Sequence, residues 1–213
     1  MKIDPKNFEG FSRVLTGVVV PRPIALVSTK SADGIVNLAP FSFFNAVAND
    51  PPTIIFSSSR RAGDEGEKTK DTLANIEATG EFVIAVVVDE IAEAMNRTAA
   101  EYPAEVNEFE VAGLTEATAD VVAPPLVAES PVNMECRLVQ VVTIGDQEHG
   151  NGLVIGEIVR MHVRDGIING HRIDHSRLKP TGRLAGNMYC YTPDTYEMVR
   201  PKYDPSKEIP ISR

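Results

Sequence analysis

Residues 24–59 constrain the fold most, because they carry three or four short runs rich in Val, Ile, Phe and Thr, separated by turn residues. Runs of this kind, bounded by Gly, Pro and Asp, are typical of β-strands joined by tight turns. The run Ile24–Thr29 precedes a turn at Ser31–Gly34, and a later run, Thr53–Phe56, ends in three serines. Between these runs Pro40 has no N–H to donate, so the sequence predicts an interruption of strand pairing there. N–H groups freed at such a break are able to point at a ligand.

The rest of the chain predicts more strands and a few short helices. Periodic apolar residues predict helices at 7–20, 71–79 and 89–98, a buried strand at 82–88, and a hairpin of long strands at 132–144 and 153–163. Residues 63–70 and 99–131 are expected to form polar, loop-rich connections. The regular alternation of strand and helix that builds a doubly wound sheet is missing. We therefore expect a mainly β protein with a closed or nearly closed antiparallel barrel.

One domain is expected over residues 1–213, with a core at about 7–192 and a C-terminal arm at 193–213 that lies on a surface or on a partner. The formal net charge of −9 disfavours binding to nucleic acid or to an anionic membrane surface. No apolar run reaches the roughly 20 residues of a membrane helix, and the N-terminus lacks the apolar core of a signal peptide. The cytoplasm is therefore the expected location. No cysteine or histidine spacing is typical of metal ligands, so no metal is expected.

A phosphate site is predicted at the start of the helix 71–79. A helix N-terminus offers unpaired N–H groups and a partial positive charge, and Lys70 and the Thr72 hydroxyl add donors. The alternative interpretation is that Asp71 or Thr69 merely caps the helix while Lys70 is a solvated surface charge.

The strand expected to face this helix start ends in polar side chains that suit phosphate. They are Ser57, Ser58, Ser59, Arg60 and Arg61. Hydroxyl groups and guanidinium groups both donate to phosphate oxygens, and arginine can donate two hydrogen bonds at once. An ordinary polar strand end is the competing interpretation, since loops often carry such residues.

The order of these motifs resembles the flavin reductase-like family of FMN-binding split barrels. The resemblance covers about residues 7–192 and rests on Val20–Thr29, Asn37–Asn45, Asp50–Pro52 and Lys70–Thr72, with support from Glu135–Leu138 and Gly156–Val159. It implies a six-stranded antiparallel Greek-key split barrel with short helical additions, a homodimer, and FMN near the subunit interface. The implied activity is NAD(P)H-dependent flavin oxidoreduction, with hydride passing from nicotinamide to flavin N5 and electrons passing on to an acceptor. No catalytic side chain is expected, because the chemistry belongs to the flavin.

The resemblance also implies which residues hold the cofactor. For the isoalloxazine and ribityl parts of FMN they are Asn37, Leu38, Ala39, Pro40, Phe41, Ser42 and Asn45. For the phosphate they are Lys70, Asp71 and Thr72. The aromatic rings of Phe41, Phe43 and Phe44 are expected to pack in the core rather than on the flavin.

Near the C-terminus, residues 178–189 are similar to a late segment of the family, with Ala185 in place of its first glycine. Arg183 and Asn187 are the candidate pocket residues there, Arg183 as a cofactor-binding residue, and a surface loop that closes the barrel is the alternative. Two alternatives to a reductase also stay open. One is a non-enzymatic FMN electron carrier of the flavoredoxin kind, and the other is an enzyme like pyridoxamine phosphate oxidase.

Overall fold

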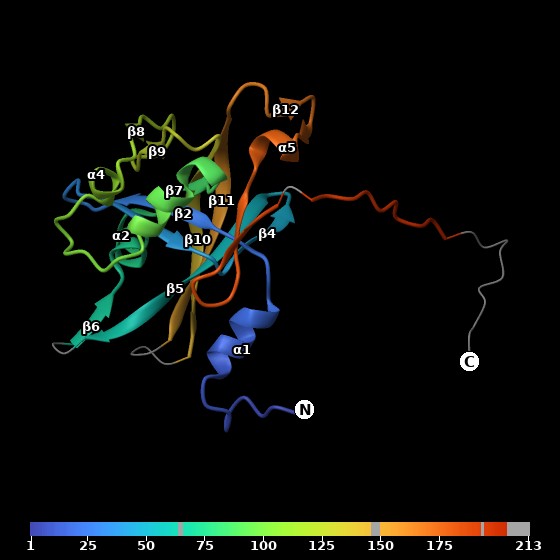
Figure 1. Ribbon diagram of the computed structural model, residues 1–213. Helices are drawn as coiled ribbons and strands as arrows, with labels where there is room; N and C mark the ends of the chain where they lie inside the picture. The colour runs from blue at the N-terminus through green and yellow to red at the C-terminus, as the bar shows by residue number, and fades with distance from the viewer. Residues whose placement is uncertain (64–65, 146–149, 193, 204–213) are drawn as a thin grey trace.

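The computed structural model describes residues 1–63, 66–145, 150–192 and 194–203. The fold is mainly β, as the sequence predicts (Figure 1). The strands are β1 (Arg22–Pro23), β2 (Ala25–Lys30), β3 (Val36–Phe41), β4 (Phe44–Asn49), β5 (Pro52–Gly63), β6 (Gly66–Thr69), β7 (Glu81–Val86), β8 (Glu116–Ala117), β9 (Leu126–Val127), β10 (Val132–Ile144), β11 (Asn151–Val163), β12 (Ile168–Asn169), β13 (Arg172–Ile173), β14 (Thr181–Arg183) and β15 (Tyr189–Tyr191). The helices are α1 (Phe11–Val18), α2 (Asp71–Thr79), η1 (Asp89–Ile91), α3 (Ala92–Arg97), α4 (Glu108–Ala112) and α5 (His175–Leu178).

Six strands enclose one core in the order β3-β2-β7-β10-β11-β5, and every neighbouring pair is antiparallel. All six contribute buried apolar side chains to a single cluster. Within the described residues, β3 and β5 at the ends of this series share no ladder. The rings of Phe41 and Phe56 meet across that gap, with centroids 4.9 Å apart. The predicted split barrel is confirmed, with β4 and β6 added to β5.

Helices cover β3 and its neighbours on two sides. On the inner side α2 contributes Leu73 and Ile76 to the barrel core. On the outer side α3 and α4 pack over β2, β3 and β7 through a second cluster that includes Leu38, Met95 and Phe109. Strand β3 therefore lies between two cores and next to two helix N-termini, a position that fixes its backbone.

Strand pairing is not interrupted at Pro40, so that prediction is wrong. Strand β2 pairs with the whole of β3, and Pro40 lies opposite Leu26. The N–H of Leu38 donates to Glu108 rather than to β2. Because every second residue of an antiparallel strand turns its N–H and C=O to the same side, Pro40 also faces away from β2. As β3 is an edge strand, Pro40 removes no ladder hydrogen bond.

The other elements match the predictions from the sequence in some places and differ in others. The predicted helix 71–79 and the long hairpin are confirmed as α2 and β10–β11, and the helix expected at 89–98 is present as η1 and α3. The segment 63–70, predicted as a loop, contains β6, which lacks the apolar residues that reveal a strand. The segment 99–131 contains α4, whose N-cap Asn107 accepts a hydrogen bond from the backbone N–H of Phe109. In the part of the chain that is described, no helix is long and apolar enough to cross a membrane.

Hydrogen bonds from Arg22 hold α1 against the barrel. Its guanidinium donates to the carbonyl oxygens of Thr16 (2.6 Å), Val19 (2.7 Å) and Leu184 (2.9 Å). Arg22 is buried, and these hydrogen bonds compensate for the cost of taking its charge out of water. The motif around Arg22 that contributes to the family resemblance thus has a structural explanation that needs no ligand.

Candidate functional site

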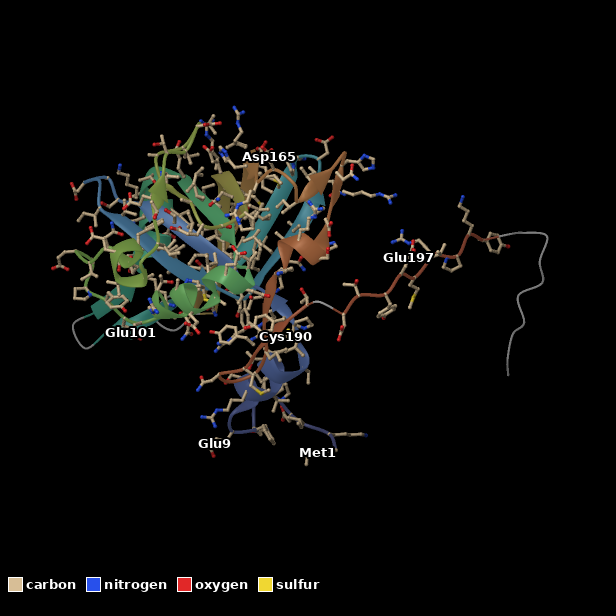
Figure 2. The ribbon with its side chains drawn as sticks, turned by 45° about the horizontal axis from the view of Figure 1, so that its top comes forward. Met1, Glu9, Glu101, Asp165, Cys190 and Glu197 are labelled. Atoms are coloured by element: carbon tan, nitrogen blue, oxygen red, sulfur yellow. The ribbon has the colours of Figure 1, made fainter. Side chains whose placement is uncertain are left out.

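A pocket of about 340 Å³ lies where β3, the start of α2, the segment after α3 and the start of α4 come together. Its lining residues are Asn37, Ala39, Pro40, Lys70, Asp71, Thr72, Thr98, Ala99, Ala100, Glu101, Tyr102, Pro103, Ala104 and Glu108. Figure 2 shows Glu101 at the rim of the molecular body. The pocket joins two motifs that the sequence placed separately, one expected to hold a flavin ring and one expected to hold a phosphate.

The α2 side of the pocket provides hydrogen-bond donors and positive charge. Lys70 is the N-cap residue of α2, and its side chain does not cap the helix. Its ammonium nitrogen lies 5.6 Å from the centroid of the Phe41 ring. The first N–H groups of a helix have no partner within the helix and carry a partial positive charge. This side of the pocket therefore suits an anionic group such as a phosphate.

Asn37 and Thr72 join β3 to α2. The side-chain amide of Asn37 donates to the hydroxyl oxygens of Thr72 at 2.9 Å and Thr29 at 3.4 Å. Asn75 in α2 also donates to Thr29, at 3.0 Å. Asn37 and Thr72 are 8% and 2% exposed. These contacts place the two motifs against each other, so both side chains have a positioning role in addition to any contact with a ligand.

The α4 side of the pocket provides acceptors. Glu108 is only 7% exposed, and its Oε2 accepts from the N–H of Leu38 at 2.9 Å. Burial raises the pKa of the Glu108 carboxyl, hydrogen bonds from the N–H groups of Leu38 and of Glu108 itself oppose the rise, and the charge of Asp71 adds to it. The carbonyl groups of Leu38 and Pro40 face the same side as the Leu38 N–H. The pocket thus has donors at one end and acceptors at the other, which fits a ligand that joins a phosphate to hydroxyl groups.

Several residues predicted to bind the cofactor lie outside this pocket. Leu38 and Phe41 are buried in the two cores. The hydroxyl of Ser42 accepts from Nε of Arg22 at 3.4 Å, and the side chain of Asn45 accepts from the next backbone N–H at 2.9 Å. Among these four, only Leu38 reaches the pocket, through its backbone contact with the carboxylate that lines it.

The serines of β5 alternate between the two faces of the strand. Ser58 is fully buried on the core face, and its hydroxyl has no hydrogen-bond partner among the described residues. Ser57 and Ser59 are half-buried on the other face. The backbone of Arg60 pairs with Thr69, immediately before α2, so the strand end does face the helix start as predicted. The side chains of Arg60 and Arg61 lie outside the described residues.

Arg183 and Phe43 lie apart from the pocket. The guanidinium of Arg183 in β14 lies 4.4 Å from the centroid of the Tyr189 ring and donates to the carbonyl of Gly186. Phe43, expected in the core, is 48% exposed, so that prediction is wrong. Phe43 falls in the tight turn between β3 and β4, where a side chain need not follow the alternation of either strand, whereas Phe44 packs against the core.

The segment 98–104 and Glu108 line the pocket but were not predicted. Apart from Thr98, they belong to the stretch 99–131, which has no sustained apolar periodicity. Only the sequence Asn107–Glu108, an N-cap residue followed by an acidic first helical position, gave a local signal of a helix start. Nothing in the spacing shows that this helix start meets β3.

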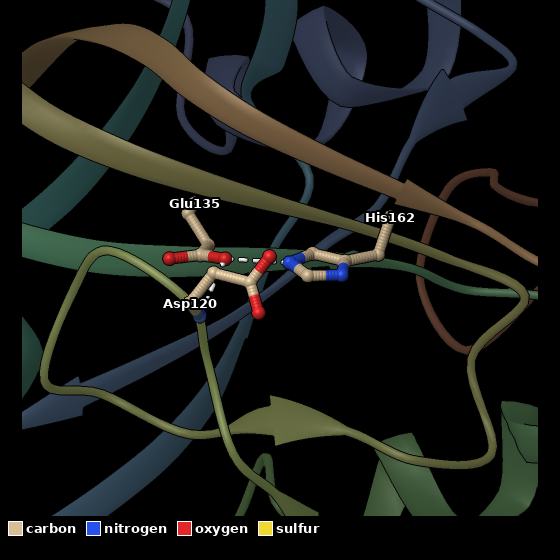
Figure 3. Close-up of side chains that lie close together, drawn as sticks. All are labelled: Asp120, Glu135 and His162. Carbon is tan, nitrogen blue, oxygen red and sulfur yellow. Dashed lines mark hydrogen bonds and ion pairs between the residues drawn. The ribbon is translucent and has the colours of Figure 1, made fainter.

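A second group of polar side chains lies on the barrel, formed by Asp120, Glu135 and His162 (Figure 3). Glu135 is fully buried and accepts from the N–H groups of Asp120 (2.9 Å), Val121 (2.6 Å) and Val122 (3.0 Å), with Nε2 of His162 at 2.5 Å. A carboxylate has about four acceptor positions, and these contacts use all of them. Burial acts to raise the pKa of Glu135, but these hydrogen bonds outweigh burial and hold it below its usual value. Glu135 therefore holds the loop at 120–122, and its carboxylate has no acceptor position left for a metal ion.

Comparison with known proteins agrees with this architecture. The uncharacterized protein BH2278 of Halalkalibacterium halodurans is 39% identical, over 98% of this chain and 100% of its own length. The crystal structure of nitrilotriacetate monooxygenase component B from Bacillus cereus superimposes with a TM-score of 0.88 at 36% identity, covering 93% of this chain and 98% of that one. The 2-nitrobenzoate 2-nitroreductase NbaA of Pseudomonas fluorescens gives 0.83 at 30% identity, covering 97% and 99%.

The family itself is shown by the sequence match. The profile of the flavin reductase like domain matches residues 17–178, which include β1 to β13, the four residues of α5 and the whole pocket. With the split barrel and the relatives above, this match establishes that the chain belongs to the flavin reductase-like domain family.

Proposed function

We propose that this protein is an NAD(P)H-dependent flavin oxidoreductase that binds FMN in the pocket between β3, α2 and α4. The observation that carries the proposal is the meeting of the Asn37–Pro40 segment with the N-terminus of α2 in one pocket. When bound, FMN accepts a hydride from the nicotinamide nucleotide and passes electrons to an acceptor.

The protein's own contribution is to bind and orient the cofactor. Lys70 and the first N–H groups of α2 hold the phosphate by charge and by directed hydrogen bonds. The hydrogen bond from Asn37 to Thr72 keeps β3 at a fixed place relative to that phosphate. The apolar surface of Ala39 and Pro40 packs against the organic part of FMN.

The electron acceptor is proposed only as a class. The two solved relatives described above are named as a monooxygenase component and as a nitroreductase. These names support a protein that delivers reducing equivalents to oxygen-dependent or nitro-group chemistry. A titration of the reduced protein with candidate acceptors, followed by the return of flavin absorbance, identifies the acceptor.

The purified protein is expected to be yellow and to release FMN rather than FAD. The start of α2 with Lys70 suits one phosphate, whereas the start of α4 brings the carboxylate of Glu108 to the pocket. The sequence also has no GxGxxG motif for a dinucleotide. Mass spectrometry of a heat-released extract distinguishes the two flavins. Finding FAD, or no flavin even after reconstitution with FMN, contradicts the proposal.

We also propose that the flavin-binding unit is a homodimer. No residue of α1 is buried, and Leu15 and Val18 on this helix are 42% and 71% exposed. The described part of the C-terminal arm projects from the body with Glu197 along it (Figure 2), and Tyr196 and Val199 are 84% and 81% exposed there. Apolar surface of this extent is typical of an interface, and two-fold dimers are the commonest oligomers.

Light scattering combined with flavin absorbance tests this proposal. One species of twice the 23.2 kDa chain mass, carrying the flavin, is expected. A monomer with its full FMN complement contradicts a homodimeric flavin-binding unit.

A further inference from the structure

Two glutamates among the described residues are buried, Glu108 and Glu135, and their surroundings differ. Glu135 has all four acceptor positions of its carboxylate occupied, as described above. Glu108 receives two hydrogen bonds, from the N–H groups of Leu38 and of Glu108 itself. Within the part of the chain that the structure describes, about two of its acceptor positions are therefore left over. Glu135 lies away from the pocket, whereas Glu108 lines it.

Among the described residues, no oxygen of Glu108 is both buried and without a hydrogen-bond partner, so its remaining acceptor capacity opens toward the pocket that it lines. Burial disfavours the charged carboxylate and raises the pKa of Glu108, while the pKa of Glu135 is lowered. If Glu108 served only to hold α4 against β3, a neutral side chain would accept from Leu38 without the cost of a buried charge. The remaining acceptor positions are best explained by a ligand that donates hydrogen bonds into the pocket.

We propose that Glu108 is a cofactor-binding residue whose carboxylate accepts hydrogen bonds from hydroxyl groups of the ribityl chain. This inference rests on the proposed function. The ribityl chain is the part of FMN that joins the phosphate to the ring, and it carries several hydroxyl donors. Glu108 faces the pocket from the α4 side, and Asp71 on the α2 side lines the same pocket and is near enough for its charge to act on the Glu108 carboxyl. The ribityl chain, which leads from the phosphate into the pocket, is therefore within reach of Glu108.

The test is the variant Glu108→Gln with three flavins, their dissociation constants measured by flavin fluorescence. Glutamine keeps an acceptor for the Leu38 N–H, but it offers less acceptor capacity and no charge. Riboflavin, which has the hydroxyl groups and no phosphate, should bind about tenfold more weakly, as expected for a lost hydrogen bond to a charged group. FMN should lose less, because removing a negative charge near its phosphate partly offsets the loss. Lumiflavin, which lacks the ribityl chain, should bind unchanged.

The matched control is Glu110→Gln on the same helix, where the glutamate is exposed and outside the pocket. It should leave all three constants unchanged. Unchanged riboflavin binding by Glu108→Gln, with tighter FMN binding, would show that Glu108 is only a neighbouring charge and would overturn the proposal. An equal loss for lumiflavin would assign Glu108 to the ring and overturn it as well.

A second measurement needs no substitution. The carbon-13 resonance of the Glu108 carboxyl group should shift when riboflavin binds to the wild-type protein and stay in place when lumiflavin binds. No shift with riboflavin overturns the proposal even if Glu108→Gln fails to fold. If the wild-type protein binds neither riboflavin nor FMN, the proposed function itself fails, and this outcome is distinct from a wild type that binds both with no contribution from Glu108.

Discussion

Replacing Lys70 by alanine should weaken FMN binding by about 1.5–3 kcal/mol, the usual cost of losing a hydrogen bond to a charged group. Lys70 is the N-cap residue of α2 and lines the pocket at the end where the helix N-terminus favours an anion. The loss should be much smaller for riboflavin, because riboflavin has no phosphate. Isothermal titration of the flavin-free protein with FMN and with riboflavin measures both constants.

Two further variants sharpen this prediction. Thr72→Val should cost less FMN affinity than Lys70→Ala, because a neutral hydroxyl is a weaker donor than an ammonium group. The Thr72 hydroxyl accepts from Asn37 and can still donate its O–H to the phosphate. Lys68→Ala is the control for a general loss of positive charge and should change little. Equal losses at Lys68 and Lys70 would place the phosphate on the β6 side, away from the helix start, and would contradict the site described here.

Replacing Glu135 by alanine should lower the free energy of unfolding by about 3 kcal/mol, since three backbone N–H groups and His162 lose their acceptor. The carboxylate of Glu135 fixes the loop at 120–122 to β10, and the exposed pair of Asp120 with Arg160 of β11, at 3.8 Å, adds little to this. Urea unfolding followed by circular dichroism gives the value. The exposed Glu105→Ala is the control and should stay within about 0.5 kcal/mol of wild type. A loss at Glu135 no larger than this would mean that the loop is held by other contacts.

The contribution of Glu135 should also depend on pH. Its pKa in the folded protein is below the ordinary value of 4.5, so the folded state favours the ionised form. The stabilisation is therefore fully present above the ordinary pKa and is lost as the pH falls through the lowered one. The stability gap between wild type and Glu135→Gln should be constant near neutral pH and shrink in acid. A gap that stays constant throughout the acid range would contradict the assignment.

The sequence predicted the barrel well because its strands carry strong local signals. β-Branched and aromatic runs with turns mark β2, β5 and the β10–β11 hairpin, and a glycine in the left-handed conformation ends α2 at Gly80 as expected. The pairing around Pro40 differs from the prediction for a physical reason. Whether a proline interrupts a ladder depends on the side to which its nitrogen points and on whether its strand lies at an edge, and neither is a local property.

Only part of the site could be predicted, because the rest of it also depends on contacts that are not local in the sequence. Asn37, Pro40 and Lys70 are marked by motifs and do meet in the pocket. Glu108 is a glutamate in an acidic, loop-rich stretch, and only the packing of α4 on β3 gives it a buried position and a raised pKa. The spacing of residues along the chain does not show which helix packs on which strand, so a single sequence cannot reveal that Glu108 is buried.

Anaerobic stopped-flow mixing of the FMN-loaded protein with NADH and, separately, with NADPH tests the central claim most directly. The proposed oxidoreductase should lose its visible flavin absorbance rapidly with at least one of the two nucleotides, at a rate that rises with nucleotide concentration. Retention of the flavin absorbance with both nucleotides, in a protein that a chemical reductant still bleaches, would contradict the claim and leave an FMN electron carrier on the same barrel.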